Sequence, residues 1–290
     1  MEDGLCPGVP VEVSGSSVGA GATSALPGES ECGFRFPLAE NRLELRHMKI
    51  VAIIQARMGS TRLPGKILRE LDGETVLSRV LGRVTRMCSV NEILVATTDQ
   101  SSDDAVAEST RQNGVGVFRG NEDDVLDRYY RAAQSCHAQA IVRITADCPL
   151  IDPEVSDHVI RQFLTARPDY ASNTLQRTYP RGLDTEVMTF AALERAWQAA
   201  SEPYQRTHVT PYLYQHPEHF DLLSITTEGD FSQMRWTLDT AEDLEFLQTV
   251  YARFADRRDF LWRDVLQLME REPELMEINR RVAQKALHEG

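Results

Sequence analysis

The chain has 290 residues, and 42% of them are hydrophobic, which is enough for one large α/β domain but leaves little for a second full domain. The formal net charge of -13 disfavours extended binding to a nucleic-acid backbone. The five cysteines are odd in number and show no C-x-x-C spacing, so they indicate neither a disulfide framework nor a zinc site. Because the sequence has no signal peptide and no apolar run long enough to span a membrane, we expect a cytoplasmic protein that binds neither nucleic acid nor membrane.

Residues 1–47 differ in composition from the rest of the chain. Gly, Ser, Pro and other small residues dominate there, and no helical or strand period is sustained. We expect this segment to be disordered, or to be a non-native extension upstream of a natural start at Met48; a regulatory tail is the alternative. The folded domain is then expected to span residues 48–290.

A short apolar run and the polar loop that follows it form the most informative stretch. Residues 49–54 are rich in β-branched side chains and predict a buried parallel strand. The next residues, 55–66, read Q-A-R-M-G-S-T-R-L-P-G-K. Glycine lets backbone N–H groups approach a phosphate closely, and the arginines and the lysine add positive charge. The stretch therefore predicts a loop that cradles a polyphosphate.

This loop matches neither of the two common phosphate-binding fingerprints. A Walker P-loop requires Ser or Thr after its lysine, and Ile67 stands after Lys66. The G-x-G-x-x-G pattern of dinucleotide-binding folds is also absent. The alternative is a basic turn at a strand end that only contacts solvent.

The following residues alternate between amphipathic helix patterns and apolar strands. The spacing predicts helix, strand, helix, strand, helix, strand and helix, in that order, over residues 76–87, 92–98, 102–112, 116–118, 123–136, 140–144 and 152–163. This order predicts an α/β fold with a largely parallel sheet and helices on both faces. In such sheets ligands bind beyond the carboxyl ends of the strands.

The second half of the chain is more irregular. Residues 234–240 predict a strand with an acidic end, followed by a helix over 241–254. A closing helical region is expected from residue 260 to about 288, where it would serve packing or dimer formation.

The charged residues at the strand ends suit nucleotidyl transfer. Arg57, Lys66 and Arg62, with N–H groups of residues 58–61, can neutralise the β- and γ-phosphates. Asp147 and Asp239 each follow an apolar strand, so they could meet at one edge of the sheet and hold Mg²⁺. The alternative for either aspartate alone is the N-cap of the next helix.

Seven motifs resemble those of the cytidylyltransferase family that makes CMP-sugar acids, with the spore-coat polysaccharide biosynthesis type as the most similar branch. They are residues 55–66 quoted above, A-T-T-D (96–99), R-G-N-E-D-D-V-L-D-R-Y (119–129), R-I-T-A-D-C-P-L-I-D (143–152), Y-P-R-G-L-D-T-E (179–186), H-V-T-P-Y (208–212) and L-D-T-A-E-D-L (238–244). The resemblance covers residues 48–270 and implies a Rossmann-like nucleotidyltransferase fold with a mixed, mostly parallel sheet. It also implies CTP as donor, Mg²⁺ held by Asp147 and Asp239, and a homodimer.

The resemblance implies site roles as well. Catalytic roles fall on Arg57, Lys66, Asp147 and, as a residue that orients the nucleophile or takes its proton, His208. Nucleotide contacts are implied for Ala56, Arg57, Met58, Gly59, Ser60, Arg62, Lys66, Ala96, Thr97, Asp99, Gly120 and Asp124. A small acidic acceptor is expected to contact Arg181, Asp184, Glu186 and His208, because an arginine matches a carboxylate or phosphonate through a bidentate fork. Glu186 could equally face water, and His208 could be a structural histidine.

Three other functions compete with a sugar-acid cytidylyltransferase. A phosphonate or sugar-phosphate nucleotidyltransferase differs only in its acceptor. A nucleotide-sugar glycosyltransferase usually holds manganese with D-x-D, whereas Asp147 stands in A-D-C-P. A non-catalytic nucleotide sensor is expected to lack Lys66 or one of the two aspartates, and all three residues are present.

Overall fold

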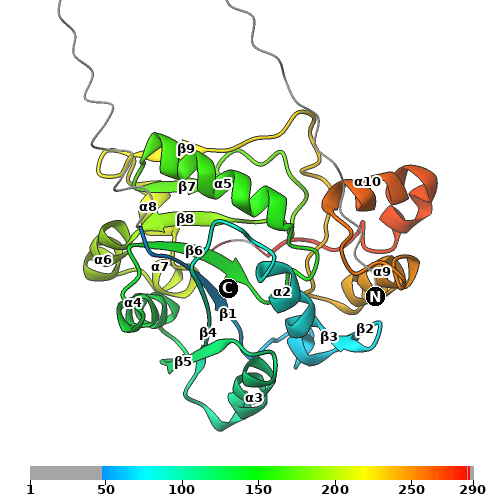
Figure 1. Ribbon diagram of the computed structural model, residues 1–290, viewed down its shortest axis with the longest axis horizontal. Helices are drawn as coiled ribbons and strands as arrows, with labels where there is room; N and C mark the ends of the chain where they lie inside the picture. The colour runs from blue at the N-terminus through cyan, green and yellow to red at the C-terminus, as the bar shows by residue number, and fades with distance from the viewer. Residues whose placement is uncertain (1–47, 286, 288–290) are drawn as a thin grey trace, which may run out of the picture.

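The computed structural model describes residues 48–285 and 287, so the prediction for residues 1–47 lies outside the described residues. A seven-stranded sheet runs through the molecule in the order β5-β4-β1-β6-β8-β7-β9 (Figure 1). The strands are β1 (Ile50–Gln55), β4 (Glu92–Thr98), β5 (Gly116–Gly120), β6 (Ala140–Thr145), β7 (Tyr170–Ser172), β8 (Glu186–Thr189) and β9 (Leu222–Ser224). The first four are mutually parallel, and β8 runs antiparallel to both of its neighbours.

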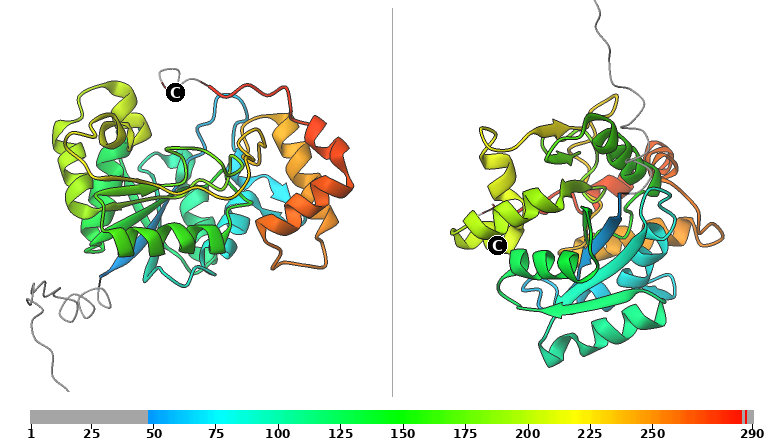
Figure 2. Two further views of the ribbon diagram at one scale, coloured as in Figure 1. Left: turned by 90° about the horizontal axis from the view of Figure 1, so that it is seen from above. Right: turned by 60° about the vertical axis from the view of Figure 1, so that its left-hand side comes forward.

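Helices cover both faces of this sheet, as the two side views show (Figure 2). The helices are α2 (Val76–Val84), α3 (Asp104–Gln112), α4 (Val125–Ser135), α5 (Pro153–Ala166), α6 (Phe190–Ala199), α7 (Pro203–His208), α8 (Pro211–Gln215), α9 (Ala241–Arg253) and α10 (Trp262–Arg271). One core cluster joins the sheet to α2 and α5, and a second joins it to α4 and α6. The predicted fold class, a mostly parallel mixed sheet between helical layers, is confirmed.

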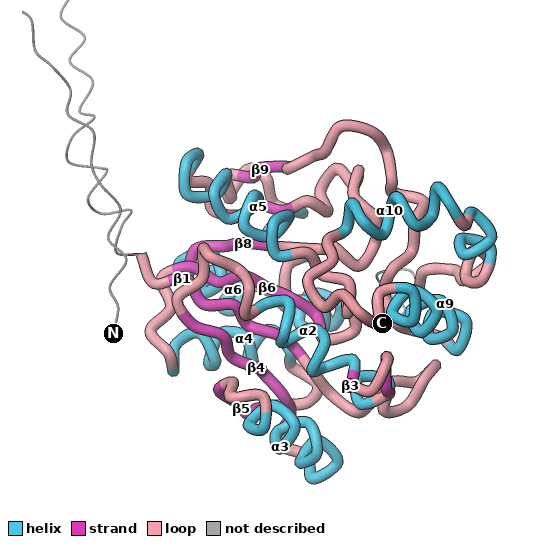
Figure 3. Tube along the Cα trace, turned by 45° about the vertical axis from the view of Figure 1, so that its right-hand side comes forward, coloured by secondary structure: helices cyan, strands magenta, loops and turns pink. Residues whose placement is uncertain are grey.

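A third core cluster forms away from the sheet, around α9 and α10. Helix α9 lies beside a two-stranded hairpin of β2 (Glu70–Leu71) and β3 (Glu74–Thr75) (Figure 3). Three 3-10 turns complete the described elements: η1 (Lys66–Leu68), η2 (Ser101–Asp103) and η3 (Pro273–Glu277). No helix in the described part of the chain has the length and apolar character needed to cross a membrane.

One predicted element is wrong, and another is shorter than expected. Residues 234–240 form no strand and make only one isolated bridge, between Arg181 and Arg235. The closing helical region is present over α10 and η3 but ends too early, because residues 278–285 contain no regular helix. Sequence patterns also missed β7, β8 and β9, which have only three or four residues and are too short to show a period.

Local sequence explains why the correctly predicted elements begin where they do. The side chain of Asp152 accepts hydrogen bonds from the N–H groups of Glu154 and Val155, and Pro153 occupies the first turn of α5. Thr75 caps α2 in the same way, through the N–H of Ser78.

Candidate active site

The loop between β1 and η1 bends tightly at the carboxyl edge of the sheet. Ala56 still bonds to the neighbouring strand, through the carbonyl of Ala96 at 3.3 Å. Gly65 then adopts a positive φ of 65°, a conformation that glycine takes without strain, and its N–H bonds back to the carbonyl of Met58. This turn aims Lys66 back over the sheet.

The prediction that all N–H groups of residues 58–61 face a phosphate is wrong for two of them. The Met58 N–H donates to Oδ1 of Asp103 at 2.6 Å, and the Ser60 N–H donates to the carbonyl of Met58 at 2.9 Å. Within residues 48–285 and 287, the N–H groups of Gly59 and Thr61 have no acceptor. Two of these four N–H groups are therefore already used in hydrogen bonds within the protein.

A cavity of about 290 Å³ lies against this loop, and we call it the triphosphate cavity. Six of the residues that line it were predicted as nucleotide contacts: Ala56, Arg57, Gly59, Ser60, Arg62 and Lys66. Asp147, Asp239 and His208 line it as well. The structure thus brings residues from four distant parts of the sequence into one cavity.

Lys66 is the centre of the charge network in this cavity. Its Nζ lies 2.6 Å from Oδ2 of Asp147 and 2.8 Å from Oδ1 of Asp239. The carbonyl of Leu238 accepts a third hydrogen bond from Nζ at 2.7 Å. Three oxygen acceptors from two distant segments therefore converge on the ammonium group of Lys66.

The pKa values follow from this arrangement. Burial by itself lowers the pKa of Lys66, but the charges of Asp147 and Asp239 outweigh it and hold the pKa above its ordinary value. Burial raises the pKa of Asp147, yet the charge and hydrogen bond of Lys66 overcome it and the pKa lies below its usual range. Lys66 and Asp147 are therefore both charged near neutral pH.

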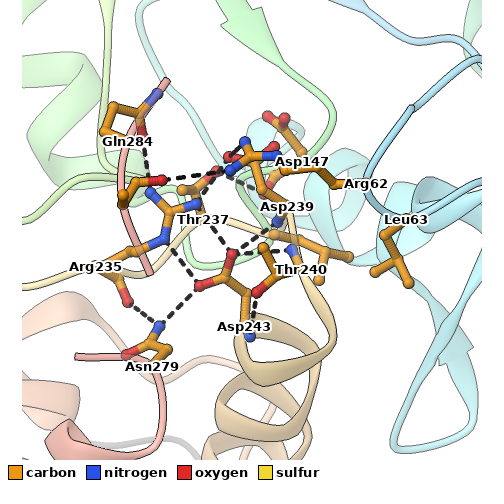
Figure 4. Close-up of polar contacts among 12 residues, drawn as sticks. Arg62, Leu63, Asp147, Arg235, Thr237, Asp239, Thr240, Asp243, Asn279 and Gln284 are labelled. Carbon is orange, nitrogen blue, oxygen red and sulfur yellow. Dashed lines mark hydrogen bonds and ion pairs between the residues drawn. The ribbon is translucent and has the colours of Figure 1, made fainter. Parts of the chain in front are cut away.

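Asp239 is surrounded by cations (Figure 4). Its Oδ2 lies 2.9 Å from Arg62 and 2.8 Å from Arg235, in addition to the Lys66 contact on Oδ1. Arg235 also pairs with the fully buried Asp243, at 2.9 Å, which fixes its direction. The contacts with Arg62, Arg235 and Lys66 fix the orientation of this carboxylate at the cavity.

The two aspartates meet although residues 234–240 form no strand. The Leu238 N–H donates to the carbonyl of Asp147 at 2.8 Å, so the two segments are joined directly beside both carboxylates. Gly182, with φ of 110°, passes so close to Trp236 that a Cβ would lie 2.6 Å from its backbone. Only glycine lets the 181–184 turn hold the extended segment in this position.

The cluster has the donor set of a cation site. Two carboxylates and a backbone carbonyl already hold one ammonium group within hydrogen-bond distance. No group of three or more His, Cys, Asp or Glu side chains that could hold a metal ion occurs among the described residues. A divalent ion here would need oxygens from a substrate to complete its coordination, as Mg²⁺ sites with one or two carboxylates do.

A second cavity, of about 420 Å³, adjoins the first, and we call it the acceptor cavity. Its lining includes all four residues predicted to contact an acceptor: Arg181, Asp184, Glu186 and His208. Two arginines that were not predicted, Arg143 and Arg177, line it as well. His208 lines both cavities, so it stands at their junction.

Two of these carboxylates are held by arginines. Arg177 clasps both oxygens of Asp184, at 2.6 and 2.8 Å. Glu186 is only 6% exposed, and its carboxylate accepts hydrogen bonds from Arg143, Tyr170 and Thr210. The alternative that Glu186 faces water is therefore wrong, because this carboxylate is fully used inside the protein.

The backbone directly after His208 is strained. Val209 adopts φ of 74° and ψ of -57°, and the Thr210 N–H closes a three-residue turn on the His208 carbonyl at 2.9 Å. A β-branched residue with positive φ costs about 1–3 kcal/mol and persists only where its surroundings impose it. The hydrogen bond from Thr210 Oγ1 to Glu186, at 2.7 Å, is one such constraint. The turn fixes where His208 leaves α7.

Six predicted nucleotide contacts are not part of the triphosphate cavity lining. They are Met58, Ala96, Thr97, Asp99, Gly120 and Asp124. Asp124 caps α4 and is paired with Arg206, which gives it a structural role. Ala96 and Thr97 are fully buried at the end of β4. Their contact with a nucleoside stays a prediction.

Sequence reasoning missed Arg128 and Lys285, which also line the triphosphate cavity. Arg128 is 1% exposed, and its Nε has no hydrogen-bond partner among the described residues. Burial lowers the pKa of Arg128, and the charge of Arg57 acts in the same direction. An available signal was its place on the apolar face of α4, three residues after Val125, where a charged residue is rare. Lys285 lies in the tail that was expected to be helical.

A family comparison agrees with this geometry. The family described as cytidylyltransferase matches residues 51–271. The chain belongs to the cytidylyltransferase family. It is therefore a nucleotidyltransferase, and the predicted family is confirmed.

Individual relatives of this cytidylyltransferase support the same assignment. It is 34% identical over 233 residues to the spore coat polysaccharide biosynthesis protein SpsF of Bacillus subtilis, which covers 78% of this chain and 95% of that relative. It is 36% identical to a cytidylyltransferase from Leptospira borgpetersenii, with a TM-score of 0.77 over 83% of this chain and 100% of that one. CMP:2-keto-3-deoxy-manno-octonic acid synthetase, solved with CTP, is 18% identical with a TM-score of 0.57 over 71% of this chain and 99% of that one, and shows the shared fold.

Proposed function

We propose that this cytidylyltransferase uses CTP to activate a small sugar acid, giving a CMP conjugate and pyrophosphate for polysaccharide or glycoconjugate biosynthesis. The family assignment supports cytidylyl transfer. A related protein named for spore coat polysaccharide biosynthesis, and a neighbour with the same fold solved with CTP, support the donor and the pathway class.

One observation carries this proposal above the others. A cationic cavity and an arginine-lined cavity adjoin each other at the carboxyl edge of the sheet, and His208 lines both. The lining of a third cavity includes residues of both of these cavities, among them Asp147, Arg181 and Asp239. A triphosphate in the first cavity and an acid in the second would meet beside His208 and Asp147.

The reaction requires a bond exchange at the α-phosphorus of CTP. The acceptor hydroxyl oxygen attacks this phosphorus and forms a new P–O bond, while the bond to the oxygen that bridges to the β-phosphate breaks and its electron pair leaves with pyrophosphate. Lys66, Arg57 and Arg128 line the triphosphate cavity and would stabilise the charge that builds on these phosphates. His208 is the residue positioned to orient the hydroxyl or to accept its proton.

Asp147 and Asp239 would hold Mg²⁺, together with oxygens of the nucleotide. The ion would supply Lewis-acid stabilisation of the phosphate oxygens. This assignment is supported by the convergence of both carboxylates on a single ammonium group, which shows that their oxygens can share one cation.

Arg181 is the residue proposed to bind the negative charge of the acceptor. Arg143 and Arg177 are each paired with a carboxylate, but Arg181 makes no ion pair within the described residues. Burial lowers its pKa, and the neighbouring charge of Arg177 lowers it further. An acceptor carboxylate would compensate this charge through a bidentate contact.

Product analysis tests the proposal. The full chain is incubated with CTP, Mg²⁺ and a pool of sugar acids, phosphonates and sugar phosphates, and products are identified by mass spectrometry. We expect a CMP conjugate of a sugar acid together with stoichiometric pyrophosphate. A conjugate formed only with a phosphonate or a sugar phosphate would replace the acceptor class, and no CMP product with any acceptor would overturn the proposal.

A further inference from the structure

A separate cavity of about 300 Å³ lies away from both site cavities, between α2 and the segment that joins α9 to α10. Arg79 and Arg83 of α2 line it, four residues apart on one helix face, and Arg86, two residues beyond the end of α2, lines it as well. Tyr251 of α9 and Arg258 complete this basic wall. We call it the arginine cavity.

Two of these arginines are cations without an acidic partner. Arg83 is only 4% exposed, yet neither Arg83 nor Arg86 lies within 4.0 Å of a carboxylate among the described residues. Nη2 of Arg83 and Nη1 of Arg86 are buried and have no hydrogen-bond partner in residues 48–285 and 287. Buried donors of this kind are rare in folded proteins.

The remaining bonds of these guanidinium groups are with neutral atoms. Arg83 donates to the Tyr251 hydroxyl and the Ile151 carbonyl, both at the long distance of 3.4 Å, and its guanidinium lies 4.2 Å from the ring centroid of Phe260. Arg86 donates to the Asp259 carbonyl at 3.0 Å. These contacts orient the two groups but leave their charge uncompensated.

The charges around the cavity do not cancel. Four arginines line it, against the carboxylates of Glu74 and Asp259. Glu74 is already shared between Arg258, at 2.6 Å, and Arg79, at 3.6 Å. Outside the cavity, Asp72 lies 3.5 Å from Arg79 and Arg257 lies 3.8 Å from Asp259, so these two outer charges offset each other. The wall thus keeps an excess of two positive charges in a protein whose formal net charge is -13.

Leaving a buried charge and its donors unpaired is costly, and such sites are normally completed by a counterion. From the two guanidinium groups without a carboxylate partner that line it, we infer that the arginine cavity is a binding site for a phosphate group, distinct from the active site. A phosphate dianion matches the excess charge of the wall, and arginine forks bind phosphate through paired N–H donors. The inference does not depend on the identity of the acceptor.

The arginine cavity is connected to the active site by short contacts. Tyr251, which lines the cavity, donates to the Pro149 carbonyl at 2.6 Å, and Arg83 donates to the Ile151 carbonyl. Both carbonyls lie within four residues of Asp147. A phosphate that draws Arg83 and Arg86 together therefore also orders the segment that carries Asp147.

Thermal unfolding of the full chain, titrated with inorganic phosphate against sodium chloride of equal ionic strength, tests the inference. We expect a saturable rise of about 2–4 °C in Tm for the wild type. Arg86→Gln should abolish this rise. Arg57→Gln, which weakens the triphosphate cavity, and Arg111→Gln, an exposed arginine of α3, should keep it. Arg83→Met provides a second variant, which should lose the phosphate response without a lower Tm in phosphate-free buffer.

Two further measurements separate the alternatives. Hydrogen exchange of residues 147–152 should slow with phosphate in the wild type and in Arg57→Gln, but not in Arg86→Gln. Glycerol phosphate is titrated in parallel, because a stronger response than to inorganic phosphate would identify a phosphate ester as the ligand class.

Three results would overturn the inference. The first is a full phosphate response in Arg86→Gln. The second is its loss in Arg57→Gln, which would place the anion in the active site. The third is a change of oligomeric state in Arg86→Gln measured by light scattering, which would show that an acidic side chain of a second copy fills the cavity.

Discussion

In the triphosphate cavity, Lys66 pairs with two carboxylates that are themselves candidate site residues, Asp147 and Asp239. In the acceptor cavity, the carboxylates Asp184 and Glu186 are each paired with an arginine that lies beside them. In the first network, a charged substrate could replace the partners of Lys66, Asp147 and Asp239. In the second, the pairs Arg143–Glu186 and Arg177–Asp184 hold each other in place; we call these two pairs the acceptor frame.

Under the proposed function, the two cavities would treat their substrates differently. A triphosphate and its metal ion would take over the charges that Lys66, Asp147 and Asp239 neutralise in one another. The acceptor cavity would keep its ion pairs and leave Arg181 to bind the acid. Variants in the two cavities should therefore fail in different ways.

Lys66→Ala is expected to have the largest effect. It removes the cation that faces the phosphates, and turnover should fall by about 10²–10³-fold, as it does when one charge-stabilising donor is removed. Asp147→Asn should cost a similar factor. Pyrophosphate release at saturating CTP measures both. Lys49→Ala, at a surface ion pair with Glu92, serves as the control, and near-normal turnover in Lys66→Ala would remove the role assigned to it.

Glu186→Gln should break the buried ion pair between Glu186 and Arg143 in the acceptor cavity. Arg143 would keep its buried position without a counter-charge, and the free energy of unfolding should drop by about 3 kcal/mol. Asp184→Asn disrupts a more exposed pair, so it should cost less than about 1 kcal/mol. Urea unfolding measures the two values. Equal losses would contradict the distinction between a buried and an exposed pair.

Arg181→Lys separates acceptor binding from donor binding. Lysine keeps the charge but loses the bidentate fork, so KM for the acceptor should rise about 10-fold while KM for CTP stays unchanged. Steady-state kinetics with each substrate varied in turn give both constants. A matched change in KM for CTP would place Arg181 on the donor side instead.

The smallest effect is expected in the pH dependence of stability. The pKa of Asp147 is depressed in the folded protein, so its stabilising contribution is present above the unfolded pKa of about 3.9 and is lost as pH falls through the folded pKa. The stability gap between wild type and Asp147→Asn, about 1 kcal/mol, should be constant from pH 5 to 8 and shrink below about pH 4. Urea unfolding across this range measures it, and a gap that widens in acid would contradict the assigned ion pair.

All four predicted acceptor residues line the acceptor cavity, but the sequence explains why the charged residues of the triphosphate cavity meet better than it explains the ion pairs of the acceptor cavity. The loop of residues 55–66 follows β1, and Asp147 follows β6. Because β1 and β6 are parallel, both segments lie at the same edge of the sheet. Asp239 reaches the same point by another route, through an extended segment bonded to the Asp147 carbonyl. Its position was predicted correctly, but for the wrong structural reason.

The acceptor frame depends on pairs that no local pattern shows. Arg143 and Glu186 lie opposite each other on β6 and β8, which are antiparallel. A mixed, mostly parallel sheet was expected, but the sequence did not indicate which strand is antiparallel to β6. One signal was available, because Arg143 interrupts an otherwise apolar strand and a buried arginine needs a partner. The identity of that partner depends on strand order, which the short strands β7 and β8 did not reveal.

A crystal structure with Mn²⁺ and a non-hydrolysable CTP analogue tests the central claim most directly, because the anomalous signal locates the ion. The account predicts one Mn²⁺ bound to both Asp147 and Asp239, with the β- and γ-phosphates against Lys66 and the loop of residues 55–66. An ion that contacts neither aspartate, or a triphosphate bound outside this cavity, would contradict it.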